Sequence, residues 1–92
     1  MISKDVIVKT KEKVGLHARP ATFFVQKANS YKSSIWVEKG DRRVNAKSLL
    51  GVLSLGIGEG TTITLISDGV DEEEALGGVG ELFQKEIGEW SL

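Results

Sequence analysis

The chain has 92 residues, of which 40% are hydrophobic and 27% are charged, and its formal net charge is −1. It has no cysteine and one histidine, which excludes disulfides and thiolate metal sites and makes a structural zinc site very improbable. The N-terminus lacks the apolar core of a signal peptide, and no run reaches the roughly 18 apolar residues of a membrane helix, so we expect a single cytoplasmic domain over residues 1–92 without metal, cofactor or membrane insertion.

The beginning of the chain predicts a strand followed by a helix. Residues 5–10 form a short β-branched run that is typical of a strand. After a loop punctuated by Gly15, apolar residues recur with the 3.6-residue period of a helix. This helix is expected to begin between His17 and Pro20 and to end near Asn29.

A β-hairpin is expected next. Residues 34–38 alternate, with Ile35 and Val37 on one side and Trp36 on the other, which indicates a half-buried strand. A turn then leads to a second arm over residues 42–45. On this pattern Trp36 lies on the open face of the sheet.

Another short helix and the clearest strand follow. Ser48 belongs to the best class of N-cap residues and precedes an apolar run over 49–55. Gly56 is suited to end that helix. Residues 61–67 are then rich in β-branched side chains, with Ile63 and Leu65 on one face, which predicts a strand.

The end of the chain predicts a last helix. Asp71 is expected to be its N-cap, and Glu74 has the spacing of a capping box with it. Glycines at 77, 78 and 80 weaken a helix, so this one is either held by packing or broken near Gly78. Trp90 is either a packing anchor or part of a frayed tail. One face of this helix is apolar: Leu76, Val79, Phe83 and Ile87.

The order of these elements is β-α-β-β-α-β-α. Helices that each have one apolar stripe must cover a single face of an antiparallel sheet. The sequence therefore predicts an α+β domain with one face of its sheet left open.

The heptapeptide at 15–21, Gly-Leu-His-Ala-Arg-Pro-Ala, is the best candidate for a functional site. Pro20 fits the first turn of a helix, where its missing N–H costs nothing. Helix N-termini bind anions, His17 offers a nucleophilic ring nitrogen, and Arg19 offers a fork for phosphate oxygens. A lone histidine is more often a surface residue or a cap, but its coupling to Arg19 and Pro20 favours a site for a phosphoryl group.

Two motifs give the chain a family resemblance. The heptapeptide resembles the active-site signature of HPr, the histidine-containing phosphocarrier protein of the bacterial sugar phosphotransferase system. Residues 45–56 resemble the regulatory-serine segment of that family, and Gly-Val-Leu-Ser-Leu-Gly is most similar to the version in low-GC Gram-positive bacteria. The resemblance implies an open-faced β-sandwich, with four antiparallel strands in the order 1-4-2-3 and three helices on one face.

The same resemblance implies a function. His17 would be the phosphorylated residue and Arg19 its partner. Enzyme I, charged from phosphoenolpyruvate, would donate the phosphoryl group, and sugar-specific EIIA domains would accept it. The protein would then be a carrier rather than a turnover enzyme, and we expect a monomer.

Apolar residues near the predicted site have two interpretations. Leu49, Leu50 and Leu53 could all be core residues of a short helix, or part of an exposed patch on which partners dock. Because relatives use residues of this helix for docking, Leu49 is preferred over the other two. Phe23, next to a buried Phe24, is also expected to be partly exposed.

Ser48 has two compatible roles. It caps a helix, which alone would explain a serine at this position. In relatives with this segment it is also phosphorylated by an HPr kinase/phosphorylase, and the modified protein acts with a LacI-type regulator in carbon catabolite repression. A regulator-only paralogue exists in which the histidine is replaced, and the presence of His17 argues against it.

Two other functional classes, an acylphosphatase and a nucleic-acid-binding protein, have less support in the sequence. An acylphosphatase would need a phosphate-cradling glycine loop leading into an arginine, and none precedes the first helix. Residues 1–48 carry 11 Lys and Arg against 4 Asp and Glu, a balance of +7, whereas residues 49–92 have 1 against 9, a balance of −8. The basic half suits an anionic substrate or an acidic partner, or it is merely solvated surface. Direct nucleic-acid binding is not favoured, because Trp36 stands alone where paired aromatics are needed.

Overall fold

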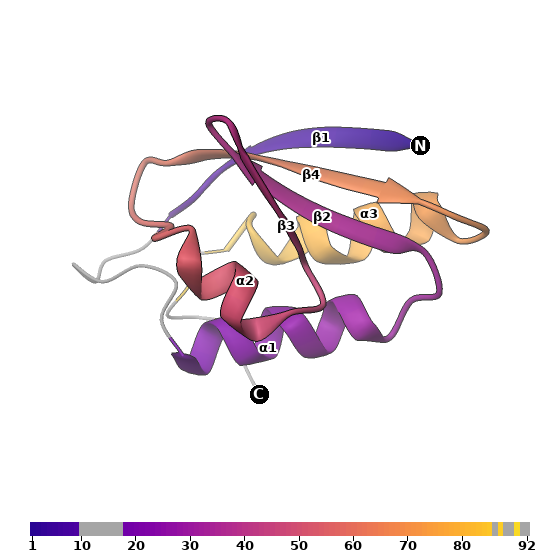
Figure 1. Ribbon diagram of the computed structural model, residues 1–92, viewed down its shortest axis with the longest axis horizontal. Coiled ribbons are helices and arrows are strands. Elements are labelled where there is room, and N and C mark those ends of the chain that lie inside the picture. The colour runs from indigo at the N-terminus through magenta and orange to yellow at the C-terminus, as the bar shows by residue number, and fades with distance from the viewer. Residues whose placement is uncertain (10–17, 86, 88–89, 91–92) are drawn as a thin grey trace.

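The computed structural model describes residues 1–9, 18–85, 87 and 90. Its antiparallel sheet has the strand order β1-β4-β2-β3. All three helices lie on one side of that sheet (Figure 1), so the predicted open-faced α+β fold is confirmed. No helix in the described part of the chain is long and apolar enough to cross a membrane. The elements are β1 (Ile2–Ile7), α1 (Ala18–Asn29), β2 (Ser34–Lys39), β3 (Arg42–Asn45), α2 (Leu49–Ser54), β4 (Thr62–Asp68) and α3 (Glu72–Leu82).

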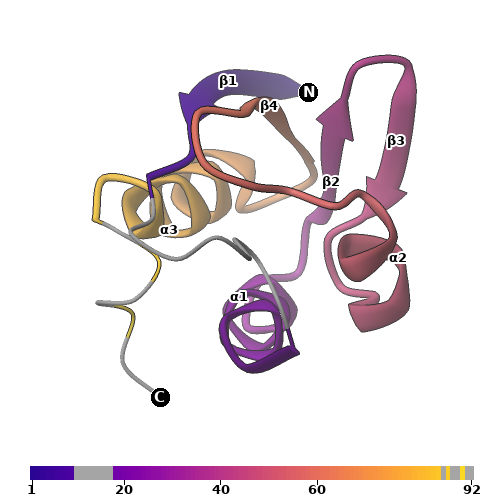
Figure 2. The same ribbon diagram turned by 90° about the vertical axis from the view of Figure 1, so that its left-hand side faces the viewer.

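The core lies between the sheet and the helices. Seen end-on, α1 lies between α3 and α2 below the strands (Figure 2). Alternate strand residues point into this layer, where they meet the apolar faces of the helices. Among the fully buried side chains are Ile35, Val37, Ile63 and Leu65 from the strands, and Phe24, Val52 and Val79 from the helices.

No helix of the described residues lies over the other face of the sheet (Figures 1 and 2). Trp36 is directly opposite Ile66 in the register of β2 and β4, and it is half-buried. Ile66 is buried outside the main core cluster, so both residues lie on the open face. The predicted location of Trp36 is confirmed.

The first strand begins earlier than predicted. It covers Ile2–Ile7 instead of residues 5–10, and Thr10 lies outside the described residues. The reason is its partner, because β4 extends to Asp68 and gives Ile2 a partner in Ser67. Strand limits are set by pairing across the sheet, which a local pattern does not contain.

The predicted capping box of the last helix is wrong. Asp71 is the N-cap of α3, but its side chain makes no capping hydrogen bond. Its carboxylate instead accepts the backbone N–H groups of Lys32, at 2.9 Å, and Ser33, at 2.8 Å, and the hydroxyl of Ser33. The Ser33 hydroxyl is the largest cause that lowers the pKa of Asp71 to about 2. Asp71 therefore ties α3 to the start of β2.

α3 is held by packing and is not broken at its glycines. It continues through Gly77 and Gly78 to Leu82. A Cβ at Gly78 would overlap the Tyr31 hydroxyl and lie 2.7 Å from ring carbon Cζ, whereas a Cβ at Gly77 would meet nothing within 4 Å. A side chain at position 78 would therefore force Tyr31 to move, whereas one at position 77 would not.

Residues after α3 close the end of the core. Trp90 Nε1 donates to the carbonyl of Leu82 at 2.6 Å, and its ring packs edge-on against Phe83 at 5.0 Å between centroids. Ile87 is buried, and its N–H donates to the Lys9 carbonyl at 2.8 Å. Trp90 is therefore a packing anchor, and the four predicted core residues from Leu76 to Ile87 are all buried.

Candidate functional site

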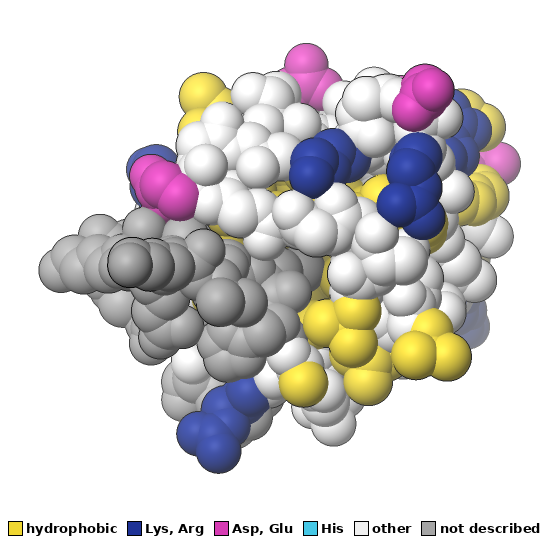
Figure 3. Space-filling model, turned by 60° about the vertical axis from the view of Figure 1, so that its left-hand side comes forward, with side chains coloured by type: hydrophobic (Ala, Val, Ile, Leu, Met, Phe, Trp, Pro, Cys, Tyr) yellow, Lys and Arg dark blue, Asp and Glu magenta, His cyan; other side chains and the backbone are white. Residues whose placement is uncertain are grey.

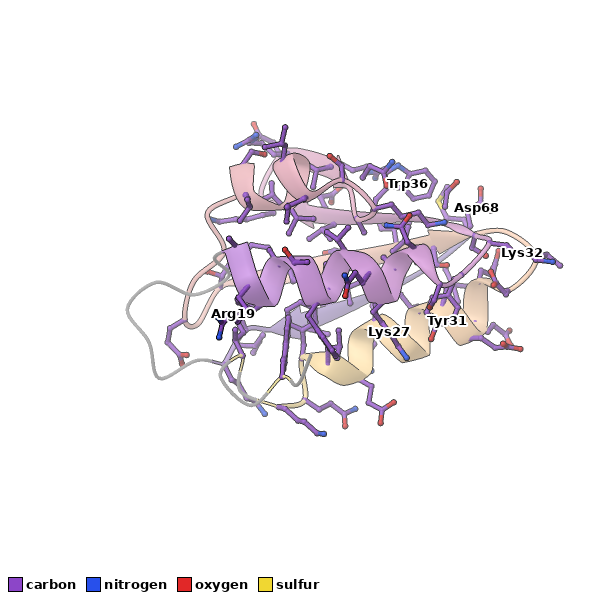
Figure 4. All side chains as sticks on the ribbon, turned by 90° about the horizontal axis from the view of Figure 1, so that it is seen from below. Arg19, Lys27, Tyr31, Lys32, Trp36 and Asp68 are labelled. Carbon is purple, nitrogen blue, oxygen red and sulfur yellow. The ribbon has the colours of Figure 1, made fainter. Side chains whose placement is uncertain are left out.

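The start of α1 lies within the predicted window. The helix begins at Ala18, and His17 immediately precedes it in the sequence but lies outside the described residues. Arg19 is exposed and projects from the first turn (Figure 4), whereas Pro20, the next residue, is buried. The buried Pro20 fixes the first turn of α1 against the core, and Arg19 on the same turn faces the solvent.

This helix start is suited to an anion. The first N–H groups of a helix lack intrahelical acceptors and lie at the positive end of the dipole. The first turn of α1 contains no acidic residue that would compete for them. Arg19 adds a full positive charge and a bidentate donor.

Within the described part of the chain, a group of acidic residues lies at the end of the molecule opposite the start of α1 (Figure 1). The first turn of α3 consists of Glu72, Glu73 and Glu74. Figure 1 shows this turn and the start of α1 at opposite ends of the long axis, and Figure 4 shows Asp68 far from Arg19. Repulsion from these carboxylates at the start of α1 is weak because solvent and salt screen charges over such a separation.

Ser48 caps α2 as predicted. Its backbone is extended, with φ −108° and ψ 115°, and its Oγ accepts the N–H of Gly51 at 3.2 Å. The Ser48 carbonyl accepts the Val52 N–H at 3.0 Å and so begins the helix. Ser48 is half-buried, so it combines a structural role with partial access to solvent.

The loop before Ser48 is fastened to the far end of α1. Lys47 Nζ donates to the carbonyl of Tyr31 at 2.8 Å, and Asn29 Nδ2 donates to the Lys47 carbonyl at 3.4 Å. Asn45 Oδ1 accepts the Lys47 N–H at 2.8 Å. These hydrogen bonds fix the residues just before Ser48 to the C-terminal end of α1, whereas Arg19 lies in the first turn of that helix.

The three leucines of α2 differ in exposure. Leu50 is 81% exposed, whereas Leu49 and Leu53 are half-buried and pack against the core. α2 is therefore turned so that Leu50 points outward, whereas the preference for Leu49 as a docking residue stays a prediction. Figure 3 shows hydrophobic side chains gathered on this face below basic ones. Phe23 is half-buried as expected, with its ring 6.4 Å from that of Trp90.

Two basic residues next to α2 were missed in the sequence. Lys39 and Arg42 flank the hairpin turn and donate to the end of α2. Neither residue belongs to a recognisable motif, and the carbonyl groups to which they donate are 12 to 17 residues away in the chain. Only the excess of basic residues in the first half of the chain pointed toward them.

Comparison with known proteins identifies the family. The family described as PTS-HPr, PTS HPr component phosphorylation site, matches residues 2–85. The HPr-like protein Crh of Halalkalibacterium halodurans is 51% identical over 86 residues, which cover 94% of this chain and all of that protein. Phosphocarrier protein HPr of Neisseria meningitidis is 46% identical over 77 residues, or 84% of this chain and 86% of that one.

A solved structure agrees with these sequence relatives. HPr-C-His from Thermoanaerobacter tengcongensis has a TM-score of 0.88 and 44% identity, covering 99% of this chain and 100% of that one. The fold, the strand order and the two sequence motifs all agree with this result. The chain therefore belongs to the HPr family of phosphocarrier proteins and is of the Gram-positive type.

Proposed function

We propose that this chain carries phosphoryl groups in a bacterial sugar phosphotransferase system, with His17 as the residue that is phosphorylated. Enzyme I donates the group, and EIIA domains of sugar permeases accept it. The observation that supports this most strongly is the first turn of α1, where Arg19 is exposed next to a buried Pro20 directly after His17 in the sequence. The family match over residues 2–85 is described by its phosphorylation site.

The chemistry needs little more than positioning and charge. A neutral imidazole nitrogen attacks the phosphorus of the phosphorylated donor, a P–N bond forms, and the bond to the donor breaks. Arg19 and the first N–H groups of α1 stabilise the negative charge of the transferred group. The heptapeptide contains no carboxylate, so it offers no general base for attack by water, which suits a carrier that must keep its phosphoryl group.

Partners are proposed to dock on the layer formed by α1 and α2. Leu50 is the most exposed apolar residue of this surface, and Leu49, Leu53 and Phe23 form its half-buried margin. An apolar centre beside a basic residue suits partners that present apolar and acidic groups.

Ser48 is proposed as a regulatory phosphorylation site. An HPr kinase/phosphorylase would modify it, and the modified protein would bind a LacI-type catabolite regulator. Two relatives are named HPr-like protein Crh, and a regulatory role in this chain would agree with that likeness. Because His17 is present, we propose that the chain has the carrier role in addition to any regulatory one.

The experiment is incubation of the chain with enzyme I and radiolabelled phosphoenolpyruvate. We expect label that depends on enzyme I and is lost in acid, as a phosphoramidate is. Label that is stable in acid, or no label with an active enzyme I preparation, would refute the proposal. The monomeric state expected from the sequence stays a prediction, which the elution volume of the same preparation tests.

A further inference from the structure

The β2–β3 hairpin holds the C-terminal end of α2 with two cations. Arg42 Nη1 donates to the carbonyl of Ser54 at 2.8 Å, and its Nη2 donates to Ser54 Oγ at 3.1 Å. Lys39 Nζ donates to the carbonyls of Leu55, at 2.9 Å, and Gly56, at 3.0 Å. We call these two residues the hairpin clamp.

The hairpin clamp completes the hydrogen bonding of the helix end. The last carbonyls of a helix have no intrahelical partner. Here the carbonyls of residues 51–53 accept the Ser54 hydroxyl, at 2.6 Å, and the N–H groups of residues 55 and 56, at 3.2 and 3.3 Å. The carbonyls of residues 54–56 accept the hairpin clamp. Six consecutive carbonyls therefore have partners, and the hairpin supplies those of the last three.

α2 is too short to be stable without such contacts. It has six residues, and isolated helices shorter than about 12 residues are marginal in water. Val52 is its only residue in the buried class, so packing fixes one side of the helix only. Two positive charges at the negative end of its dipole favour the helical form, as Ser48 does at the other end.

We propose that Lys39 and Arg42 are positioning residues for partner docking. They hold the last turn of α2, and thereby keep exposed Leu50 in the orientation that a partner contacts. This inference rests on the proposed function, in which enzyme I docks on α2. Without the hairpin clamp, only a fraction of the molecules has a helical α2 at any time. The apparent affinity for the partner is then the intrinsic affinity multiplied by that helical fraction.

The chain contains a matched control on the same hairpin. Arg43 is adjacent to Arg42, but its side chain pairs with Glu38, with Nε and Nη2 each 3.0 Å from Oε2. Glu38 lies opposite Thr64, in the row that includes Trp36 on the open face of the sheet. Arg43→Met therefore removes one positive charge from the hairpin, as Arg42→Met does, but the hydrogen bond and ion pair that it removes are with Glu38 and not with α2.

The experiment combines kinetics with hydrogen exchange. Lys39→Met/Arg42→Met is compared with Arg43→Met as a substrate of enzyme I. We expect the double variant to raise KM about fivefold, as a competent fraction of about one fifth would, and to leave kcat within about twofold. The N–H groups of residues 55 and 56 should exchange at least about fivefold faster, while those of β4 stay unchanged.

Two further variants make the test independent of overall stability. Lys39→Arg/Arg42→Lys keeps both charges and should return KM to within about twofold of the unsubstituted chain. If the double methionine variant does not fold, Arg42→Met alone is measured, with an intermediate rise in KM expected.

The outcomes that contradict the inference are separate from those that contradict the proposed function. Unchanged KM in the clamp variants, equal effects of Arg43→Met, or faster exchange throughout the molecule would each overturn the positioning role. Failure of the unsubstituted chain to be labelled would refute the proposed function. Normal labelling of that chain with an unchanged KM in the clamp variants would overturn this inference alone.

Discussion

Substitution of Ser48 separates its structural role from its proposed regulatory one. Ser48→Ala removes the hydroxyl that accepts the Gly51 N–H at 3.2 Å, which costs about 1 kcal/mol. For a chain of this size that free energy lowers the melting temperature by about 4–8 °C. Ser48→Asp restores an N-cap oxygen and adds a negative charge where the helix dipole favours one. We therefore expect Ser48→Asp to melt within a few degrees of the unsubstituted chain.

The two substitutions are expected to rank in the opposite order for docking, with Ser48→Asp impaired more than Ser48→Ala. Any stabilisation of α2 by the introduced carboxylate is present in the free and bound states alike, so it cancels on binding. Repulsion from an acidic partner exists only in the complex, where like charges brought together cost several kcal/mol. Since each 1.4 kcal/mol changes affinity about tenfold, Ser48→Asp should accept phosphoryl groups from enzyme I at least about tenfold less efficiently. Ser48→Ala loses the cap of α2 but brings no charge into the interface, so it should transfer much more efficiently than Ser48→Asp despite its lower melting temperature.

A charge elsewhere provides the control. Ser3 is exposed on β1 and lies opposite Ile66, on the open face, so Ser3→Asp adds the same charge away from both helices of the proposed docking surface. The assay is one thermal melt and one transfer rate for each of the three variants. If Ser48→Asp transfers like the unsubstituted chain, or if Ser3→Asp is equally impaired, Ser48 lies outside the docking surface and the reasoning fails.

Three further predictions follow from single contacts. Gly77→Ala should stabilise the chain by up to about 1 kcal/mol. Gly78→Ala should be less stable than Gly77→Ala by about 1–3 kcal/mol, because Tyr31 must move. Equal denaturant midpoints for the two variants would contradict the packing of Tyr31 against Gly78. The pKa of Asp71 is lowered to about 2 in the folded chain, so the ionised carboxylate stabilises the fold fully above its ordinary pKa of 3.8 and loses this effect as the pH falls toward 2. Asp71→Asn should therefore lower the free energy of unfolding at pH 7 and flatten the acid limb of a stability–pH curve. An unchanged acid limb would argue against the contact between Asp71 and the start of β2. Arg19→Lys keeps the charge but loses the bidentate fork, so transfer should slow in both directions at near-normal stability, and equal rates would show that a point charge is enough.

Local patterns in the sequence predicted most elements. The 3.6-residue period from Ala21 to Ala28 located α1, and the alternation around Trp36 located β2 together with the open face of the sheet. The serine before residues 49–55 located the start of α2. Each of these signals lies within the element that it predicts, because the element and its burial arise from the same short run of residues.

The errors and the open alternatives concern contacts between distant residues. Asp71 has the residue type and spacing of a capping box, but its carboxylate accepts donors 38 and 39 residues away. The sequence left open whether the last helix breaks near Gly78 or is held by packing, because the Tyr31 ring that lies against this glycine belongs to another part of the chain. A six-residue helix is also too short for its period to show which of Leu49, Leu50 and Leu53 is exposed. In each case tertiary contacts decide the outcome.

The proposed site itself depends on the heptapeptide. Arg19 and Pro20 occupy the first turn of α1, as predicted. His17 lies outside the described residues, so its role rests on the sequence, the family match and the chemistry of its neighbours. The regulatory role of Ser48 stays a prediction beside its confirmed role as a cap.

The most direct test is to locate the phosphoryl group in the intact chain. After incubation with enzyme I and phosphoenolpyruvate, fragmentation mass spectrometry at neutral pH should find one phosphate, on His17, which is the only histidine. His17→Ala should take up none and should melt like the unsubstituted chain. A phosphate on another residue, or undiminished uptake by His17→Ala, would contradict the assignment.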